Sequence, residues 1–343
     1  MKTIFIAGAG GYIGSKMVGT FLGQGSKVIA FDRYFFGDNL NDLASDNLTI
    51  VKDDIRFFDK KILKNVDAII DLASISNDPA SELMPSITEE INHLGAVNLA
   101  KLGKEMGVKK YVLSSSCSVY GSGEQVLNEE SSVAPISVYA KCKLLAEKDI
   151  IGLADDNFCV TFLRNGTVYG LSERRMRFDL IINIMALHAW KNRKIFIMGG
   201  GKQWRPLVHL DDVINAFKIT IDENDAKKIN KQIFNVGSNE QNFQVYQVAH
   251  KFRDYFQDLK IDVAPDDPDP RNYHVNFDKI GKVLNYKTKK TIDDGIVEIK
   301  NALDQGKITD DITTRTVEYY KYLINADQVL SKVKLNNFLF KRI

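Results

Sequence analysis

The chain has 343 residues, of which 44% are apolar and 26% charged, proportions that exclude a disordered or fibrous protein. Its 46 Lys and Arg nearly balance its 44 Asp and Glu, and no basic run or basic stretch with interleaved aromatics marks a nucleic-acid surface. No segment approaches the roughly 18 apolar residues of a membrane span. We therefore expect no nucleic-acid partner and no membrane.

The three cysteines, Cys117, Cys142 and Cys159, are odd in number and lack the CxxC spacing of redox or zinc motifs. We expect free thiols in a reducing compartment and hence a cytoplasmic protein. The five histidines share no HxxH or HExxH spacing, so we expect no metal site.

Short runs rich in branched apolar residues alternate with longer segments of helical periodicity. This alternation predicts an α/β fold, a Rossmann-type doubly wound parallel sheet with helices on both faces. The predicted strands are Thr3–Ala7, Lys27–Phe31, Leu48–Val51, Ala68–Leu72, Tyr111–Ser115 and Val160–Leu163. The predicted helices between them include Tyr12–Leu22, Ile87–Met106 and Val138–Leu153.

The sequence pattern changes after Gly170, where the alternation of predicted strands and helices gives way to a basic, irregular stretch. A predicted helix at Val213–Ile221 and a buried strand at Gln232–Val236 indicate that the chain then returns to the first sheet. We expect residues 1–170, with a return at about 208–240, to form a dinucleotide-binding domain. Residues 171–207 and 241–343 are then a smaller, discontinuous C-terminal substrate domain. Its tail after Asp310 is predicted to be helical and charged.

A glycine-rich turn, Gly8-Ala9-Gly10-Gly11-Tyr12-Ile13-Gly14, follows the first predicted strand and opens a predicted helix. Glycines let a pyrophosphate approach the N–H groups and the positive dipole of that helix end. Asp32 ends the second predicted strand, 18 residues after Gly14, where a carboxylate can bind the adenosine ribose and repel a 2′-phosphate. We therefore predict NAD, while the adjacent Arg33 leaves NADP as an alternative.

Tyr139 and Lys143 lie four residues apart in a predicted helix and therefore share a face. A nearby ammonium favours the phenolate of a tyrosine and so makes it a usable base. The pair follows Ser114-Ser115-Ser116 at the end of the fifth predicted strand, where catalytic groups gather in open α/β sheets. We predict Tyr139 as the base, Lys143 as its cation and Ser116 as the group that orients a substrate hydroxyl.

Together these motifs resemble the extended short-chain dehydrogenase/reductase family, in particular its nucleotide-sugar epimerases and dehydratases, over nearly the whole chain. The glycine turn is similar to the family's GxxGxxG, and the segment from Ser114 to Gly121 to its SSxxVYG element. The resemblance implies NAD as the cofactor and these cofactor-binding residues: Gly8, Gly11, Tyr12, Ile13, Gly14, Asp32, Arg33, Asp54, Ile55, Leu72, Ala73, Ser74, Asn92, Ser114, Tyr139 and Lys143.

The resemblance also implies a nucleotide diphosphate sugar as the substrate. The segment from Arg205 to Asp212 is similar to the family's R(D)(F/Y)(I/V)HVxD element, whose arginine commonly meets the diphosphate. The implied substrate-binding residues are Asn77, Ser116, Thr167, Arg177, Arg205 and Arg271. Related enzymes pair the helices that correspond to Ile87–Met106 and Val138–Leu153 with a second copy, so we expect a homodimer.

One departure from the family pattern narrows the chemistry. The 4,6-dehydratases carry an Asp-Glu pair directly after the catalytic Ser/Thr, whereas this chain has Cys117 and Ser118. We therefore expect oxidation of a ring hydroxyl, with C4 favoured, by an epimerase or dehydrogenase rather than dehydration. The alternatives are an NAD(P)H-dependent ketoreductase of a keto sugar, or a non-catalytic dinucleotide-binding sensor or scaffold.

Overall fold

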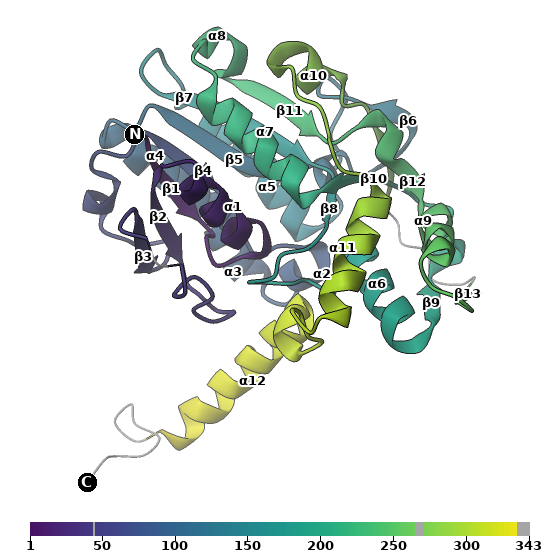
Figure 1. Cartoon of the computed structure of the whole chain (residues 1–343). Coiled ribbons are helices and arrows are strands. Elements are labelled where there is room, and N and C mark those ends of the chain that lie inside the picture. Colours follow the sequence, from purple (N-terminus) through teal and green to yellow (C-terminus); the bar gives the residue numbers. More distant parts are fainter. Residues whose placement is uncertain (44, 265–270, 335–343) are drawn as a thin grey trace.

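The computed structural model describes residues 1–343 except 44, 265–270 and 335–343. Within these residues, seven strands form one sheet in the order β11-β7-β5-β4-β1-β2-β3, and every adjacent pair is parallel. The order runs outward from β1 in both directions, which confirms the predicted doubly wound sheet (Figure 1). The strands are β1 Thr3–Ala7, β2 Lys27–Asp32, β3 Leu48–Lys52, β4 Ala68–Asp71, β5 Lys110–Ser116, β7 Cys159–Asn165 and β11 Gln232–Val236.

Helices cover both faces of this sheet and bury its central strands on each side. All four residues of β4 are buried, and so are all seven of β7. One face packs against α1 (Tyr12–Gly23) and α7 (Leu210–Asp222), and the other against α4 (Ala96–Glu105) and α5 (Val138–Ile151). The near-continuous apolar runs seen in the sequence follow from this two-sided burial.

The predicted helix at Ile87–Met106 is divided into three parts. A short helix α3 (Pro85–Glu89) leads into a π-helical turn over Glu90–Gly95, and α4 continues from there. At the turn, a Cβ added to Gly95 would lie 2.9 Å from the side chain of Ile55. Apolar periodicity in the sequence indicates which face of a helix is buried. It does not indicate a local change from α-helical to π-helical pitch, so the sequence did not predict the π-helical turn.

After Asn165, the last residue of β7, the chain leaves the large sheet, returns to it through α7 and β11, and then leaves again. The elements that flank one end of the large sheet contain three small sheets, β8-β10-β12, β9-β13 and β6-β14, and β6 comes from the segment between β5 and α5. Their strands are β6 Ser122–Leu127, β8 Thr167–Tyr169, β9 Lys194–Ile197, β10 Trp204–His209, β12 Asn242–Gln244, β13 Lys260–Val263 and β14 Asn272–Val275. The remaining helices are α2 Asp78–Ser81, α6 Ile181–Asn192, α8 Ala226–Ile229, α9 Val245–Lys251, α10 Asp278–Leu284, α11 Ile292–Asp304 and α12 Thr316–Val333.

The last helix, α12, extends away from the rest of the molecule (Figure 1). It begins beside α2, and farther along it carries the exposed side chains of Tyr322, Val329 and Val333. The helical prediction for the tail after Asp310 is therefore confirmed for residues 316–333.

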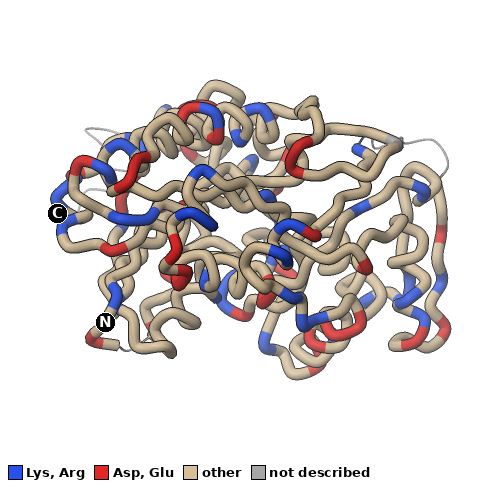
Figure 2. The backbone as a smooth tube through the Cα atoms, turned by 90° about the horizontal axis from the view of Figure 1, so that it is seen from above, with Lys and Arg blue, Asp and Glu red and all other residues tan. Residues whose placement is uncertain are grey.

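Basic and acidic residues are interspersed along the backbone (Figure 2). Many of them pair locally, as Lys218 does with Asp222 and Lys300 with Asp304. In the part of the chain that the structure describes, no helix is long and apolar enough to cross a membrane.

Candidate active site

A cleft of about 1150 Å³ lies along the carboxyl ends of the central strands, between the large sheet and the C-terminal elements. Ligands bind at this edge in open α/β sheets. The cleft gathers every predicted site residue except Asn92: Gly8, Gly11, Tyr12, Ile13, Gly14, Asp32, Arg33, Asp54, Ile55, Leu72, Ala73, Ser74, Asn77, Ser114, Ser116, Tyr139, Lys143, Thr167, Arg177, Arg205 and Arg271.

The glycine turn is packed so closely that side chains do not fit in it. Gly8 has a φ of +81°, and an added Cβ would lie 2.7 Å from the carbonyl carbon of Leu72 and 2.8 Å from the amide nitrogen of Ala73. Gly11 is the N-cap of α1 and provides no side chain to cap its first N–H groups. The helix end therefore offers backbone donors and its positive dipole to a phosphate, and the turn fits a dinucleotide pyrophosphate.

Asp32 is held at the end of β2 by two backbone donors. Its carboxylate accepts hydrogen bonds from the amides of Gly10, at 3.0 Å, and Tyr34, at 2.6 Å. Burial raises the pKa of this carboxyl group, and the backbone hydrogen bonds oppose that shift. The carboxylate has acceptor capacity left for a ribose hydroxyl.

Arg33, because of which the sequence kept NADP as an alternative cofactor, lies near Asp54 and Phe35. Its Nε lies 3.7 Å from an oxygen of Asp54, and its guanidinium lies 5.2 Å from the ring centroid of Phe35. Asp54 is also held by two hydrogen bonds from Arg56, which lower its pKa against the effect of burial. This arrangement draws the Arg33 charge toward Asp54 and favours NAD over NADP.

Asn92 lies behind the cleft, in the π-helical turn. Its side chain binds the backbone of Ile75, which lines the cleft. Its Oδ1 accepts a hydrogen bond from the Ile75 amide at 2.8 Å, and its Nδ2 donates one to the Ile75 carbonyl at 3.0 Å. These two bonds fix the segment after β4, which carries Leu72, Ala73 and Ser74 along the cleft.

Ser116, Tyr139 and Lys143 meet where β5 ends beside the start of α5. The Lys143 nitrogen lies 5.8 Å from the centroid of the Tyr139 ring. Lys143 is buried, which lowers its pKa, while the buried carboxylate of Asp71 opposes that shift. Asp71 is itself fixed by the hydroxyl of Tyr111 at 2.5 Å. Asp71 and Tyr111 thus form a support for the lysine that the sequence motifs did not indicate.

Burial raises the pKa of the Tyr139 phenol above its usual value. The carboxylate of Asp78 raises it further, whereas a hydrogen bond from Ser116 and the charge of Arg177 lower it. The phenol is therefore protonated in the free cleft at neutral pH. Of the charged groups around the phenol, Arg177 favours the phenolate and Asp78 opposes it.

The short helix α2 holds the N-terminus of α5 and so positions Tyr139. The Tyr139 amide donates to Ser81 Oγ at 3.1 Å, and the Val138 amide donates to a carboxylate oxygen of Glu82 at 3.0 Å. The Ser137 hydroxyl donates to Asp78. Asn, Asp and Pro are also typical of ordinary turns, so these tertiary contacts decide the role of the segment.

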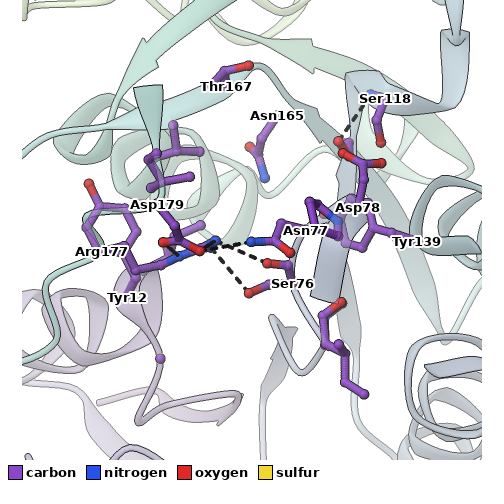
Figure 3. A pocket seen from close by; sticks show the side chains of 18 of the residues that line it. Tyr12, Ser76, Asn77, Asp78, Ser118, Tyr139, Asn165, Thr167, Arg177 and Asp179 are labelled. Atoms are coloured by element: carbon purple, nitrogen blue, oxygen red, sulfur yellow. Dashed lines mark hydrogen bonds and ion pairs between the residues drawn. The ribbon is translucent and has the colours of Figure 1, made fainter. Parts of the chain in front are cut away.

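Arg177 is bound within the wall of the cleft. Its guanidinium forms two 2.9 Å contacts with the carboxylate of Asp179, and it also donates to Ser76 (Figure 3). Asn77 donates to the same carboxylate at 2.9 Å. Two predicted substrate-binding residues are thus linked through Asp179, a residue that the sequence did not single out.

The two other predicted phosphate-binding arginines lie together. An Arg205 Nη1 donates to the Arg271 carbonyl at 2.5 Å, and Arg271 pairs with Asp78 at 2.6 Å. Arg205 comes from β10 and Arg271 immediately precedes β14, so residues 66 apart in the chain present two guanidinium groups to one part of the cleft. Bidentate guanidinium groups suit a diphosphate.

Four residues that line the cleft carry a buried polar atom with no hydrogen-bond partner among the residues that the structure describes: Arg175 Nε, Gln203 Oε1, Ser118 Oγ and Asn165 Oδ1. The last two belong to residues labelled in Figure 3. A buried polar group without a partner costs about 1–3 kcal/mol, so both atoms are suited to meet a ligand hydroxyl or amide. Asn165 was not predicted, because no motif marks it and only the packing of β7 beside β5 brings it to the cleft.

Cys117, next to Ser116, belongs to the protein interior. Its thiol is 1% exposed and lies 3.2 Å from the Arg164 carbonyl, to which it donates a hydrogen bond. Burial raises its pKa well above the usual value. A buried, protonated thiol is unsuited to be a base or nucleophile, and all three cysteines are buried free thiols.

At the junction of the large sheet and the C-terminal elements, His209, Asp211 and Glu298 are close enough to share a metal ion. Each already has a protein partner. His209 Nε2 lies 2.8 Å from Glu298, its Nδ1 accepts from the Asp211 amide, and Lys16 forms a 2.5 Å ion pair with Asp211. These contacts tie β10 to α11, and α7 to α1, and they give each member of the cluster a protein partner.

The fold and the cleft define a Rossmann-type enzyme that binds a dinucleotide at the switch point of its sheet. The chain belongs to the NAD dependent epimerase/dehydratase family, whose profile matches residues 4–237. This membership confirms the family expected from the sequence, the enzyme class and NAD as the cofactor.

Individual relatives are distant. The chain is 26% identical over 332 residues to UDP-glucuronate 4-epimerase of Thermodesulfobacterium geofontis, covering 88% of this chain and 96% of that one. Among solved structures it resembles MoeE5 in complex with UDP-glucuronic acid and NAD, with a TM-score of 0.78, 24% identity and coverage of 89% and 99%. The UDP-glucuronic acid 4-epimerase of Bacillus cereus aligns with a TM-score of 0.75, 22% identity and coverage of 88% and 99%. These structures confirm the fold.

Proposed function

We propose that this protein uses NAD to oxidise a ring hydroxyl, at C4, of a nucleotide diphosphate sugar, as an epimerase or a dehydrogenase. The observation that carries the proposal is the meeting of Ser116, Tyr139 and Lys143 with the Gly8–Gly14 turn in one cleft. The related UDP-glucuronate 4-epimerase supports the sugar nucleotide as the substrate class and C4 as the reacting carbon.

In the proposed reaction, the Tyr139 phenolate takes the proton of the substrate hydroxyl, and Ser116 orients that hydroxyl. NAD bound in the cleft supplies the acceptor for the hydride that leaves the same carbon. Arg177 provides positive charge that favours the phenolate against its burial, and the ammonium of Lys143 lies 5.8 Å from the centroid of the Tyr139 ring. The removal of a proton by a positioned base typically contributes about 10²–10⁴-fold to the rate.

For the substrate, Arg205 and Arg271 hold the diphosphate, and Asn77, Thr167 and Arg177 border the sugar. Ser118 Oγ and Asn165 Oδ1 add two acceptors for ligand groups. We propose that residues 1–170, with the return at about 208–240, hold the dinucleotide, and that 171–207 and 241–343 hold the sugar nucleotide. The attachment of α7 and β11 to the large sheet supports this division.

We also propose a homodimer formed by the π-helical turn, α4 and α5. These elements pack against each other on one face of the sheet, and two large apolar side chains point outward from them: Leu94 is 53% exposed and Leu145 39%. A symmetric copy would cover both. The three free thiols support a location in the reducing cytoplasm.

A substrate deuterated at C4 tests the chemistry and the fate of the ketone. An epimerase returns the label to the sugar, whereas a dehydrogenase leaves it on the reduced dinucleotide. Transfer of label from a deuterated reduced dinucleotide to a keto sugar, without the forward reaction, would favour the ketoreductase. Absence of hydride exchange with any sugar nucleotide would leave the non-catalytic sensor as the better description. Formation of unlabelled reduced dinucleotide from a sugar that keeps all of its deuterium at C4 would exclude C4 as the oxidised carbon.

A further inference from the structure

The C-terminal helix α12 contributes two residues to the wall of the cleft. Val317 and Tyr320, both partly buried, line it together with residues of the glycine turn and of the loop after β2. None of the dinucleotide motifs extends to this helix. The tail that the sequence left without a function thus forms part of the binding site.

The start of α12 is fixed against the rest of the cleft by specific bonds. The Phe178 amide donates to the Thr314 carbonyl at 2.8 Å, just before the helix. An Arg175 Nη2 donates to Thr316 Oγ1 at 3.4 Å, and the guanidinium of Arg175 stacks on Phe36, 3.7 Å from its ring centroid. The helix therefore has a defined position relative to the loop that follows β2.

Aromatic packing joins α12 to that loop. The Tyr320 ring lies 5.5 Å from that of Phe36 and 6.2 Å, edge to face, from that of Phe35. Tyr319 adds a ring 5.3 Å from Phe36. Phe35 and Phe36 also line the cleft and follow Asp32 by only a few residues. Each of these aromatic contacts is weak by itself, so the helix and the loop can separate, while the set of contacts favours the closed arrangement.

Tyr320 faces the charged part of the cleft. Burial raises the pKa of its hydroxyl to about 12, and Asp32 adds to that shift, while Arg175 and Arg177 oppose it. The Tyr320 hydroxyl is therefore close enough to Asp32 and to the two arginines to be affected by their charges. Its ring packs on Phe36, which also carries the guanidinium of Arg175.

We propose that α12 closes the dinucleotide site, with Val317 and Tyr320 as binding residues that hold the cofactor against the Gly8–Gly14 turn and must separate from the Phe35–Phe36 loop before it leaves. This proposal rests on the proposed function, because it requires that the ligand bound at the Gly8–Gly14 turn is NAD. It also favours one of the two proposed outcomes. A dehydrogenase must exchange its cofactor in every turnover, whereas an epimerase returns the hydride to the sugar and keeps its cofactor. A closed site fits the epimerase.

The test measures how fast NAD leaves, not how fast the enzyme works. The full-length protein is loaded with isotopically labelled NAD, mixed with an excess of unlabelled NAD, and the label remaining on the protein is followed over time. Tyr320→Ala is compared with Tyr322→Ala, which removes the same ring from the same helix at a position that is 55% exposed and outside the cleft. Thermal unfolding of both variants verifies that they are folded.

We expect Tyr320→Ala to release NAD at least about tenfold faster than the wild-type protein, because lost contacts act mainly on dissociation. Tyr322→Ala should match the wild-type rate. Equal rates from the two variants would overturn the closing role of α12 and leave the proposed function intact. If Tyr320→Ala does not fold, the milder Val317→Ala takes its place in the same comparison with the same criterion. A wild-type protein that binds no NAD would instead contradict the proposed function itself.

Discussion

Glu147 and Arg164 form a buried ion pair beneath the cleft, with Nη2 to Oε2 at 2.6 Å and Nε to Oε1 at 3.0 Å. Glu147 lies one turn after Lys143 on α5, and Arg164 lies on β7, so the pair ties the helix of Tyr139 to the sheet. The Ser115 hydroxyl also donates to Glu147, and Arg164 donates to Tyr120 at 3.1 Å. A single network thus holds α5, β5 and β7 in the register that brings the site together.

Removing one partner of this pair should leave an uncompensated buried charge. We expect Glu147→Ala to lower the free energy of unfolding by about 3–5 kcal/mol. The control is Glu105→Ala, which breaks an ion pair with Lys60 that is about half exposed on both sides and should cost less than about 1 kcal/mol. Denaturant unfolding measures the free energy of unfolding of both variants. Similar losses of stability would show that the buried ion pair contributes no more than the exposed one.

The role of Tyr139 as the base predicts a loss of chemistry without a loss of binding. Tyr139→Phe removes only a hydroxyl, so fold and NAD affinity should stay nearly unchanged while hydride transfer falls by about 10²–10⁴-fold. Single-turnover rates on a sugar nucleotide substrate, with NAD binding measured in parallel, provide the check. Turnover retained at the wild-type rate would falsify the assignment.

The raised pKa of Tyr139 predicts the pH dependence of the reaction. A base must lose its proton before it can act, so kcat/KM should rise with pH toward the pKa of the phenol, which burial and Asp78 place above its usual value. Asp78→Asn removes a negative charge that raises this pKa. We expect the rising limb of the profile to move to lower pH in this variant. A movement to higher pH, or none, would show that Asp78 does not act on the phenol through its charge.

Asp32 should govern the choice of dinucleotide. Asp32→Ala removes both an acceptor for the ribose hydroxyl and a charge that repels a 2′-phosphate. Because a hydrogen bond to a charged group contributes about 1.5–3 kcal/mol, NAD affinity should fall by roughly tenfold or more, and the preference should move toward NADP. Calorimetric titration with each cofactor measures both effects. Equal affinity of the native protein for NAD and NADP would contradict the role of Asp32.

The proposed dimer predicts that a charge on its helices prevents assembly. Leu145→Glu places a carboxylate at an apolar position of α5, and we expect a monomer by light scattering at micromolar concentration. Val263→Glu, at a 52% exposed apolar position of β13, is the control and should leave the assembly unchanged. A wild-type monomer would contradict the proposal directly.

Much of this site was predictable because its parts are local in the sequence. The Gly8–Gly14 turn depends on the conformations of successive residues, and Tyr139 and Lys143 share a face through helical geometry alone. The order of apolar runs likewise determined the large sheet, since strands buried on both faces have few alternatives. Each of these features depends on a stretch of sequence no longer than one strand or a few helical turns.

Tertiary structure decided which distant groups support or oppose that chemistry. Asp78 acts on Tyr139 from the start of α2, Asp71 acts on Lys143 from β4, and Asp179 binds Arg177 and Asn77. Tyr320 comes to the cleft from near the end of the chain. No periodicity or motif encodes these contacts, because they depend on how loops and a terminal helix pack across the ends of the strands. The sequence by itself predicted the fold and the proposed reacting groups, and long-range packing determines their electrostatic surroundings and the place of α12 along the cleft.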